Sequence, residues 1–121
     1  MDVGRAPAGF TVTVTTLGRS VVVRPEGELD HDTAQPLREA LEAALRGPPG
    51  PVVIDCAGLT FCDSTGLNLL LRTRLAAEGD GRTLVLAGPS RMLARVLEIT
   101  GAEAFFHIRP SVAEALAGPD G

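Results

Sequence analysis

The apolar run Val52–Cys56 constrains the fold of this 121-residue chain more than any other segment. A short, continuous apolar run is typical of a strand that is covered on both faces, as in a parallel sheet between two layers of helices. The preceding loop Pro48–Pro51 is rich in proline and glycine and marks the start of that strand. We therefore expect residues 52–56 to form a central strand of an α/β sheet.

The segments around this strand alternate between strand and helix patterns. Residues 10–15 alternate apolar and threonine side chains, and with 21–24 they predict a β-hairpin. Apolar residues at helical spacing predict four helices, which begin after Thr33, near Leu67, after Ser90 and after Ser111. We expect the side chain of Thr33 to cap the first of them. Further strands are expected at residues 83–87 and 105–108. The order ββαβαβαβα predicts an α/β fold with a mixed, mostly parallel sheet of about 4–5 strands and about 4 helices.

Two of the expected helices carry particular signals. The second should run from Leu67 to about Gly79, with its apolar face formed by four leucines: Leu67, Leu70, Leu71 and Leu75. The third should be capped by Ser90 and end at Gly101.

Length and charge limit the domain organisation and the class of partner. The chain has the length of one domain, which we expect over residues 10–117, between a flexible start at 1–9 and a flexible end at 118–121. Its apolar runs are too short to span a membrane, and no signal-peptide core is visible, so we expect a cytoplasmic protein. The net charge is −4 and the arginines are scattered along the sequence, so we expect no basic patch that could bind nucleic acid or anionic lipid. A protein partner or a small ligand is therefore expected.

Missing residue types exclude several kinds of chemistry. The chain contains no Lys, which excludes a P-loop and a Schiff-base enzyme. Cys56 and Cys62 have neither the spacing of a redox pair nor a second cysteine pair for zinc. We expect two reduced, mostly buried thiols, with no metal and no cofactor.

The loop after the central strand is the main candidate for a functional site. Asp63, Ser64 and Thr65 stand together at the start of the leucine-rich helix, and ligands of open α/β sheets meet the loops beyond the carboxyl ends of the strands. Three residues of the cap-forming type are more than one helix needs. The alternative from spacing alone is that one residue caps the helix while the other two are merely solvated.

Two motifs in this sequence resemble the STAS-domain anti-sigma factor antagonists. Residues 52–67 are similar to the family's apolar strand, short loop and Asp-Ser-Ser/Thr-Gly-Leu, and residues 26–30 are similar to its Gly-x-Leu-Asp. The element order agrees over nearly the whole chain. The resemblance implies that Ser64 is the phosphorylated serine and that Asp30 is an acidic residue near it. Thr65, where many relatives have a second serine, and Cys62 depart slightly from the pattern.

The resemblance also implies partners and a cycle. The unphosphorylated antagonist would bind an ATP-dependent anti-sigma factor serine kinase and so free a sigma factor. Phosphorylation of Ser64 would release the antagonist, and a metal-dependent serine phosphatase would reset it. The expected partner-binding residues are Asp30, Asp63, Thr65, Gly66 and Leu67. Gly66 would allow the backbone of the partner to approach closely.

Three other functions compete with this one. A hydrolase with Ser64 as nucleophile and His31 as base is disfavoured because the loop lacks Gly-x-Ser-x-Gly, so no enzyme activity is expected. A receiver domain phosphorylated on Asp55 is also disfavoured. Receiver domains resemble one another in placing a Lys beside the phosphate, and this chain contains no Lys. A STAS module that senses a ligand or joins a signalling assembly, without serine phosphorylation, stays open.

Overall fold

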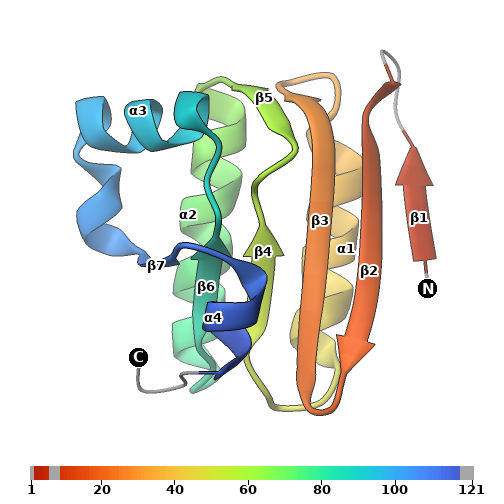
Figure 1. Cartoon of the computed structure of the whole chain (residues 1–121). Helices are drawn as coiled ribbons and strands as arrows, with labels where there is room; N and C mark the ends of the chain where they lie inside the picture. The colour runs from red at the N-terminus through yellow and green to blue at the C-terminus, as the bar shows by residue number, and fades with distance from the viewer. Residues whose placement is uncertain (1, 6–8, 118–121) are drawn as a thin grey trace.

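The computed structural model of the chain describes residues 2–5 and 9–117, which form a mixed sheet with helices on both faces (Figure 1). The strands are β1 (Asp2–Arg5), β2 (Thr11–Leu17), β3 (Ser20–Leu29), β4 (Val52–Asp55), β5 (Leu59–Cys62), β6 (Leu84–Ala87) and β7 (His107–Arg109). The helices are α1 (Ala34–Arg46), α2 (Ser64–Gly79), α3 (Arg91–Thr100) and α4 (Val112–Ala117), with a 3₁₀ turn η2 (Ala102–Phe105). The strand order is β1-β2-β3-β4-β6-β7, and β5 pairs with β3 alone.

The predicted fold class is confirmed, with two strands more than the sequence pattern indicated. β1 lies within the segment that we expected to be a flexible start, and it pairs antiparallel with β2, Gly4 opposite Val12. β5 lies within the segment that we expected to be a loop, and it pairs parallel with β3. The expected flexible residues 1, 6–8 and 118–121 lie outside the described residues.

Strand β3 is longer than the hairpin pattern predicted because it serves two neighbours in succession. Its first part pairs with β4, Val21 opposite Val52, and its last part pairs with β5, Leu29 opposite Cys62. Within the second part the register shifts between Gly27, opposite Leu59, and the next residue, and Gly27 has a φ of +115°. Glycine suits this position because a positive φ is unfavourable for residues with a side chain.

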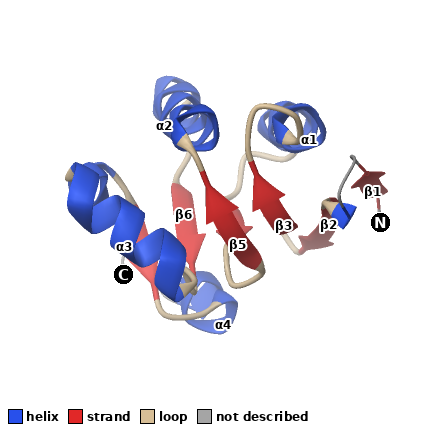
Figure 2. Ribbon diagram, turned by 90° about the horizontal axis from the view of Figure 1, so that it is seen from above, coloured by secondary structure: helices blue, strands red, loops and turns tan. Residues whose placement is uncertain are grey.

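The helices divide into two layers around the sheet. α1 and α2 cover one face and α4 lies against the other (Figure 2). Val53 and Ile54 of β4 are fully buried, Ile54 in the large core and Val53 in a smaller cluster with Ala115 of α4. The prediction that this strand is covered on both faces is confirmed.

The apolar face predicted for α2 is partly wrong. Leu70 is fully buried as expected, but Leu75 is 60% exposed and Leu67 and Leu71 are only half-buried. The buried side of the helix instead consists of Gly66, Leu69, Leu70, Thr73 and Ala77. Leucines at 67, 69, 70 and 71 surround the helix, so their spacing does not determine which side faces the sheet.

The predicted limits of α3 are confirmed. The Ser90 hydroxyl accepts a hydrogen bond of 3.3 Å from the amide of Leu93, as an N-cap does. Gly101 ends the helix in the left-handed conformation.

Candidate modification and partner-binding site

Asp63 caps helix α2 and leaves the hydroxyl of Ser64 free of that task. The Asp63 carboxylate accepts a hydrogen bond of 3.0 Å from the amide of Gly66. Ser64, the first residue of the helix, is exposed, and Thr65 is half-buried. Of the three residues of the cap-forming type, the one in the middle therefore presents its hydroxyl at the surface.

The start of α2 is electrostatically suited to an anion. The carbonyl of Asp63 accepts the first helical hydrogen bond, from Leu67 at 3.0 Å, so the amides of Ser64 and Thr65 precede the hydrogen-bond ladder of the helix. These N–H groups and the helix dipole favour negative charge at this end. A phosphate on Ser64 would lie where the helix itself tolerates it.

The loop between β3 and α1 is held by hydrogen bonds between Asp30 and Thr33. One carboxylate oxygen of Asp30 accepts from the amides of Asp32 (2.9 Å) and Thr33 (3.1 Å). The Thr33 hydroxyl, which is buried, accepts from the amide of Asp30 at 2.9 Å and donates to the carbonyl of Glu28 at 2.7 Å. Thr33 precedes α1 as predicted, but the expected capping by its side chain is wrong, because the hydroxyl points back into the loop.

The two loops lie side by side at one edge of the sheet. Leu29 is opposite Cys62 in the β3–β5 pair, which Figure 2 shows end-on, and the amide of Asp63 donates to the carbonyl of Leu29 at 3.2 Å. Asp30 and Ser64 follow directly after these joined residues. The fold thus brings the two expected site segments together through the backbone of β5, a strand that sequence reasoning missed.

Gly66 has a different role from the one that we expected. A Cβ atom at this position would lie 2.7 Å from Cγ of Leu29 and 3.0 Å from Sγ of Cys62. Gly66 is buried, and the space beside it is filled by the core of the protein itself. The missing side chain therefore allows α2 to pack closely on β3 and β5, and it does not make room for the backbone of a partner.

Both cysteines are free and buried, as the sequence predicted. Burial, and secondarily the charge of Asp63, raises the pKa of the Cys62 thiol from 9.0 to about 11. Burial likewise raises the pKa of Cys56, beyond that of Cys62. Both thiols are protonated at neutral pH, which makes them unreactive packing groups.

Asp55, the residue of the receiver-domain alternative, is engaged in an ion pair that the sequence pattern did not reveal. Its carboxylate accepts from Nη1 of Arg24 at 2.7 Å, and Nε of Arg24 donates to Glu26 at 2.8 Å. Hydrogen bonds to Glu26 and Asp55 raise the pKa of the Arg24 guanidinium. Alternation along β3 puts Arg24 and Glu26 on one face, which is the only sequence signal for this pairing.

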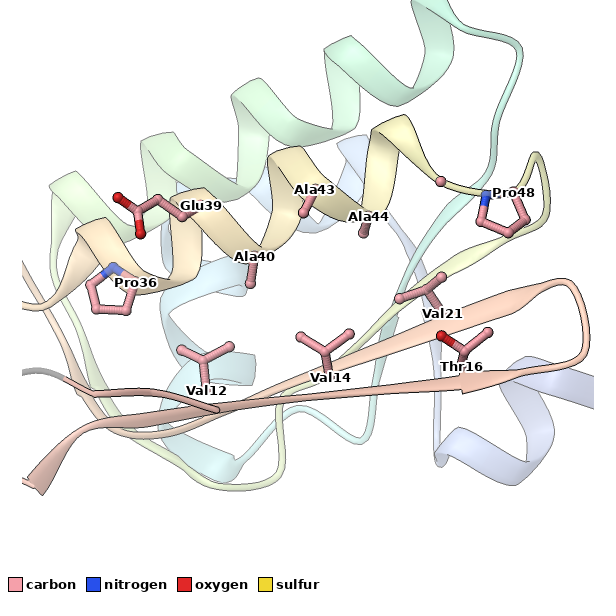
Figure 3. A pocket seen from close by; sticks show the side chains of 11 residues that line it. Val12, Val14, Thr16, Val21, Pro36, Glu39, Ala40, Ala43, Ala44 and Pro48 are labelled. Atoms are coloured by element: carbon pink, nitrogen blue, oxygen red, sulfur yellow. The ribbon is translucent and has the colours of Figure 1, made fainter. Parts of the chain in front are cut away.

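A hollow of about 440 Å³ lies between α1 and the β2–β3 hairpin (Figure 3). Alanines of α1, Ala40 and Ala44, face Val12 and Val14 of β2 across it. Throughout the described part of the chain, every buried side-chain nitrogen or oxygen has a hydrogen-bond partner. The hollow therefore presents no unpaired buried polar group to anchor a ligand, and it gives the ligand-sensing alternative no specific support.

The described residues also contain no cluster of three or more His, Cys, Asp or Glu side chains that could hold a metal ion. Within the same residues, no helix has the length and apolar character needed to cross a membrane.

Comparison with known proteins assigns the class of protein that this fold and site define. The family described as "Mlab, STAS domain" matches residues 12–110, and the chain belongs to the STAS-domain family. An anti-sigma-B factor antagonist of Staphylococcus aureus is 29% identical over 99 residues, which are 82% of this chain and 92% of that protein.

Solved structures agree with this assignment. The crystal structure of an anti-sigma factor antagonist from Mycobacterium paratuberculosis is 31% identical, with a TM-score of 0.77 over 93% of this chain and 96% of that one. The Bacillus cell fate determinant SpoIIAA in its phosphorylated form is 26% identical, with a TM-score of 0.68 over 87% and 96% of the two chains. The resemblance to anti-sigma factor antagonists is confirmed. These relatives are described as anti-sigma factor antagonists and not as enzymes.

Proposed function

We propose that this protein is an anti-sigma factor antagonist whose binding to an anti-sigma factor serine kinase is ended by phosphorylation of Ser64. The observation that carries the proposal is the exposed hydroxyl of Ser64 at the start of α2, beside a residue that already caps the helix. Its support is the similarity to antagonists, among them a relative described in a phosphorylated form.

The chemistry belongs to the partners, and this chain supplies the acceptor. Ser64 Oγ attacks the γ-phosphorus of ATP in the kinase, its proton passes to a base of the kinase, and ADP leaves. A metal-dependent serine phosphatase later uses water to release inorganic phosphate and restore the hydroxyl. The proposed contact residues are Asp30, Asp63, Thr65 and Leu67, whereas Gly66 is buried against the core.

One modification can end the complex without unfolding the protein. Phosphate adds about 1.5–2 negative charges. The amides at the start of α2 accommodate that charge within the domain. For the partner, the same charge adds to those of Asp30 and Asp63, and it must be desolvated beside the apolar surface of Leu67. Release follows because only the complex has to desolvate the phosphate.

The proposed cycle takes place in the cytoplasm. The kinase consumes ATP and the sigma factor acts on transcription, so both partners work in that compartment. Two free, buried thiols fit a reducing environment.

The proposal is tested with purified protein, ATP and the anti-sigma factor serine kinase encoded in the same genome. We expect a stable complex without ATP, and with ATP one phosphoryl group per chain, placed on Ser64 by peptide mapping. The Ser64→Ala variant should take up none, and the matched Thr65→Ala variant should still be modified. Phosphate on Thr65 or Asp55, or failure of the unmodified chain to bind the kinase, would refute the proposal.

A further inference from the structure

A groove of about 400 Å³ runs along α2 beside the junction of α3 and η2. Leu67, Leu71 and Leu75, each one helical turn apart, form one wall. Thr100, Ala102 and Phe105 belong to the opposite wall. We call these residues, together with Arg74, the α2 groove. It begins one turn after Ser64 on the same helix.

The α2 groove is a second apolar side of a helix that has already buried its first. Leu69 and Leu70 pack into the core, whereas Leu75 is 60% exposed and faces a groove in which Phe105 is 55% exposed. Clustered exposed apolar side chains of this size mark interaction surfaces. Leu75 and Phe105 thus form an apolar surface that the packing of the domain leaves open.

The polar side chains in the groove are already bonded within the protein. Arg74 pairs with Glu78, with 2.8 Å between the guanidinium and the carboxylate. The Thr100 hydroxyl donates to the carbonyl of Val96 at 2.7 Å. Removing water from the groove therefore leaves few unmet polar groups, and the surface suits apolar side chains of a protein better than a charged or strongly hydrogen-bonding ligand.

The position of the groove identifies its occupant. A specific protein interface involves about 20 residues or more on each side, far more than the few around Ser64. Leu67 belongs both to the proposed contact around Ser64 and to the groove, and Leu75 follows about 12 Å further along the helix. A partner that covers Ser64 and extends along α2 covers the groove.

We infer that the α2 groove is a second docking surface for the anti-sigma factor, filled by apolar side chains of that protein. This inference rests on the proposed function. Leu75 lies roughly 16 Å along the helix from Ser64, beyond the Debye length of about 8 Å at physiological salt. The far end of the groove, at Leu75, thus supplies affinity that the phosphate does not alter, while Ser64 supplies the switch.

The test measures binding of Leu75→Gln, Phe105→Gln and the double variant to the purified anti-sigma factor kinase. Leu17→Gln is the matched control, because Leu17 is 48% exposed and lies at the β2–β3 turn, outside the groove. We expect the double variant to lose affinity by about tenfold or more. The loss should be the same factor in a Ser64→Asp background. The KM for phosphorylation should rise while kcat stays within twofold, and the control should bind as wild type.

Two outcomes would overturn the inference, and a third would refute the proposed function on which it rests. Unchanged affinity of variants whose melting temperature is that of the wild type overturns the inference. If the variants abolish self-association in sedimentation but bind the kinase normally, the groove serves a second copy of this chain, which also overturns it. If the double variant fails to fold, the two single variants decide. If the wild-type chain does not bind the kinase, the proposed function is refuted. The assignment of the kinase as the occupant of the groove is then refuted as well.

Discussion

The amide of Asp63 donates a hydrogen bond of 3.2 Å to the carbonyl oxygen of Leu29. This bond joins the end of β3, which precedes the loop of Asp30, to the residue that caps α2 and precedes Ser64. The hydroxyl proposed as the switch and the acidic residue proposed beside it are therefore connected through the backbone, and the Asp30 carboxylate adds hydrogen bonds within its own loop.

Substitutions of Ser64 in opposite directions should separate binding from stability. Ser64→Ala keeps the Asp63 cap and should cost at most about 1 kcal/mol of unfolding free energy. It should stay bound to the kinase in the presence of ATP. Ser64→Asp should keep or slightly gain stability at the helix start and bind more weakly. Calorimetric titration with thermal melts measures both quantities, and equal affinities of the two folded variants would contradict the switch.

Gly66→Ala should destabilise the protein although alanine favours helices. The new Cβ would meet Leu29, which is fully buried, at 2.7 Å. We expect a loss of about 1–3 kcal/mol from overpacking. Gly79→Ala is the control in the same helix, because nothing lies within 4 Å of its added Cβ. That control should gain up to about 1 kcal/mol. Urea unfolding measures both, and a stable Gly66→Ala would show that α2 shifts freely on β3.

Thr33→Val should loosen the loop that carries Asp30. Valine has nearly the same shape as threonine but loses the hydrogen bonds to the partly buried backbone groups of Glu28 and Asp30, which should cost about 0.5–1.5 kcal/mol each. Thr33→Ser retains the hydroxyl and should lose less. Hydrogen exchange of the Asp30 amide should quicken in the valine variant and not in the serine variant. Equal exchange rates of the Asp30 amide in the two variants would show that the Thr33 hydroxyl does not hold this loop.

The buried thiol of Cys62 should make stability fall at high pH. Its pKa is raised in the folded protein from 9.0 to about 11, so the unfolded chain releases this proton first. The contribution of the protonated Cys62 thiol to the free energy of unfolding is fully present below pH 9 and is lost as the pH rises toward 11. Urea unfolding between pH 8 and 11 should show a smaller decline for Cys62→Ala than for wild type. Parallel curves would indicate that the thiol ionises normally in the folded state.

The sequence by itself determined the elements whose signals are local. The run Val52–Cys56 predicted a doubly covered strand, and Ser90 and Gly101 predicted the limits of α3, because an apolar run and helix caps are signals carried by neighbouring residues. The Asp63–Leu67 motif located the candidate site for the same reason. Its functional meaning came from resemblance and not from periodicity.

Only the tertiary structure decided what depends on distant partners. β5 forms because Leu59–Cys62 pairs with the end of β3, a partner that is distant in the sequence. Packing against the sheet and α1 determines which side of α2 is buried. The sequence does not determine it, because leucines occur all around the helix. Gly66 is required by the side chain of Leu29, which is 37 positions away in sequence but packs against it. Such contacts are set by the register of β3 and β5, and no local pattern encodes that register.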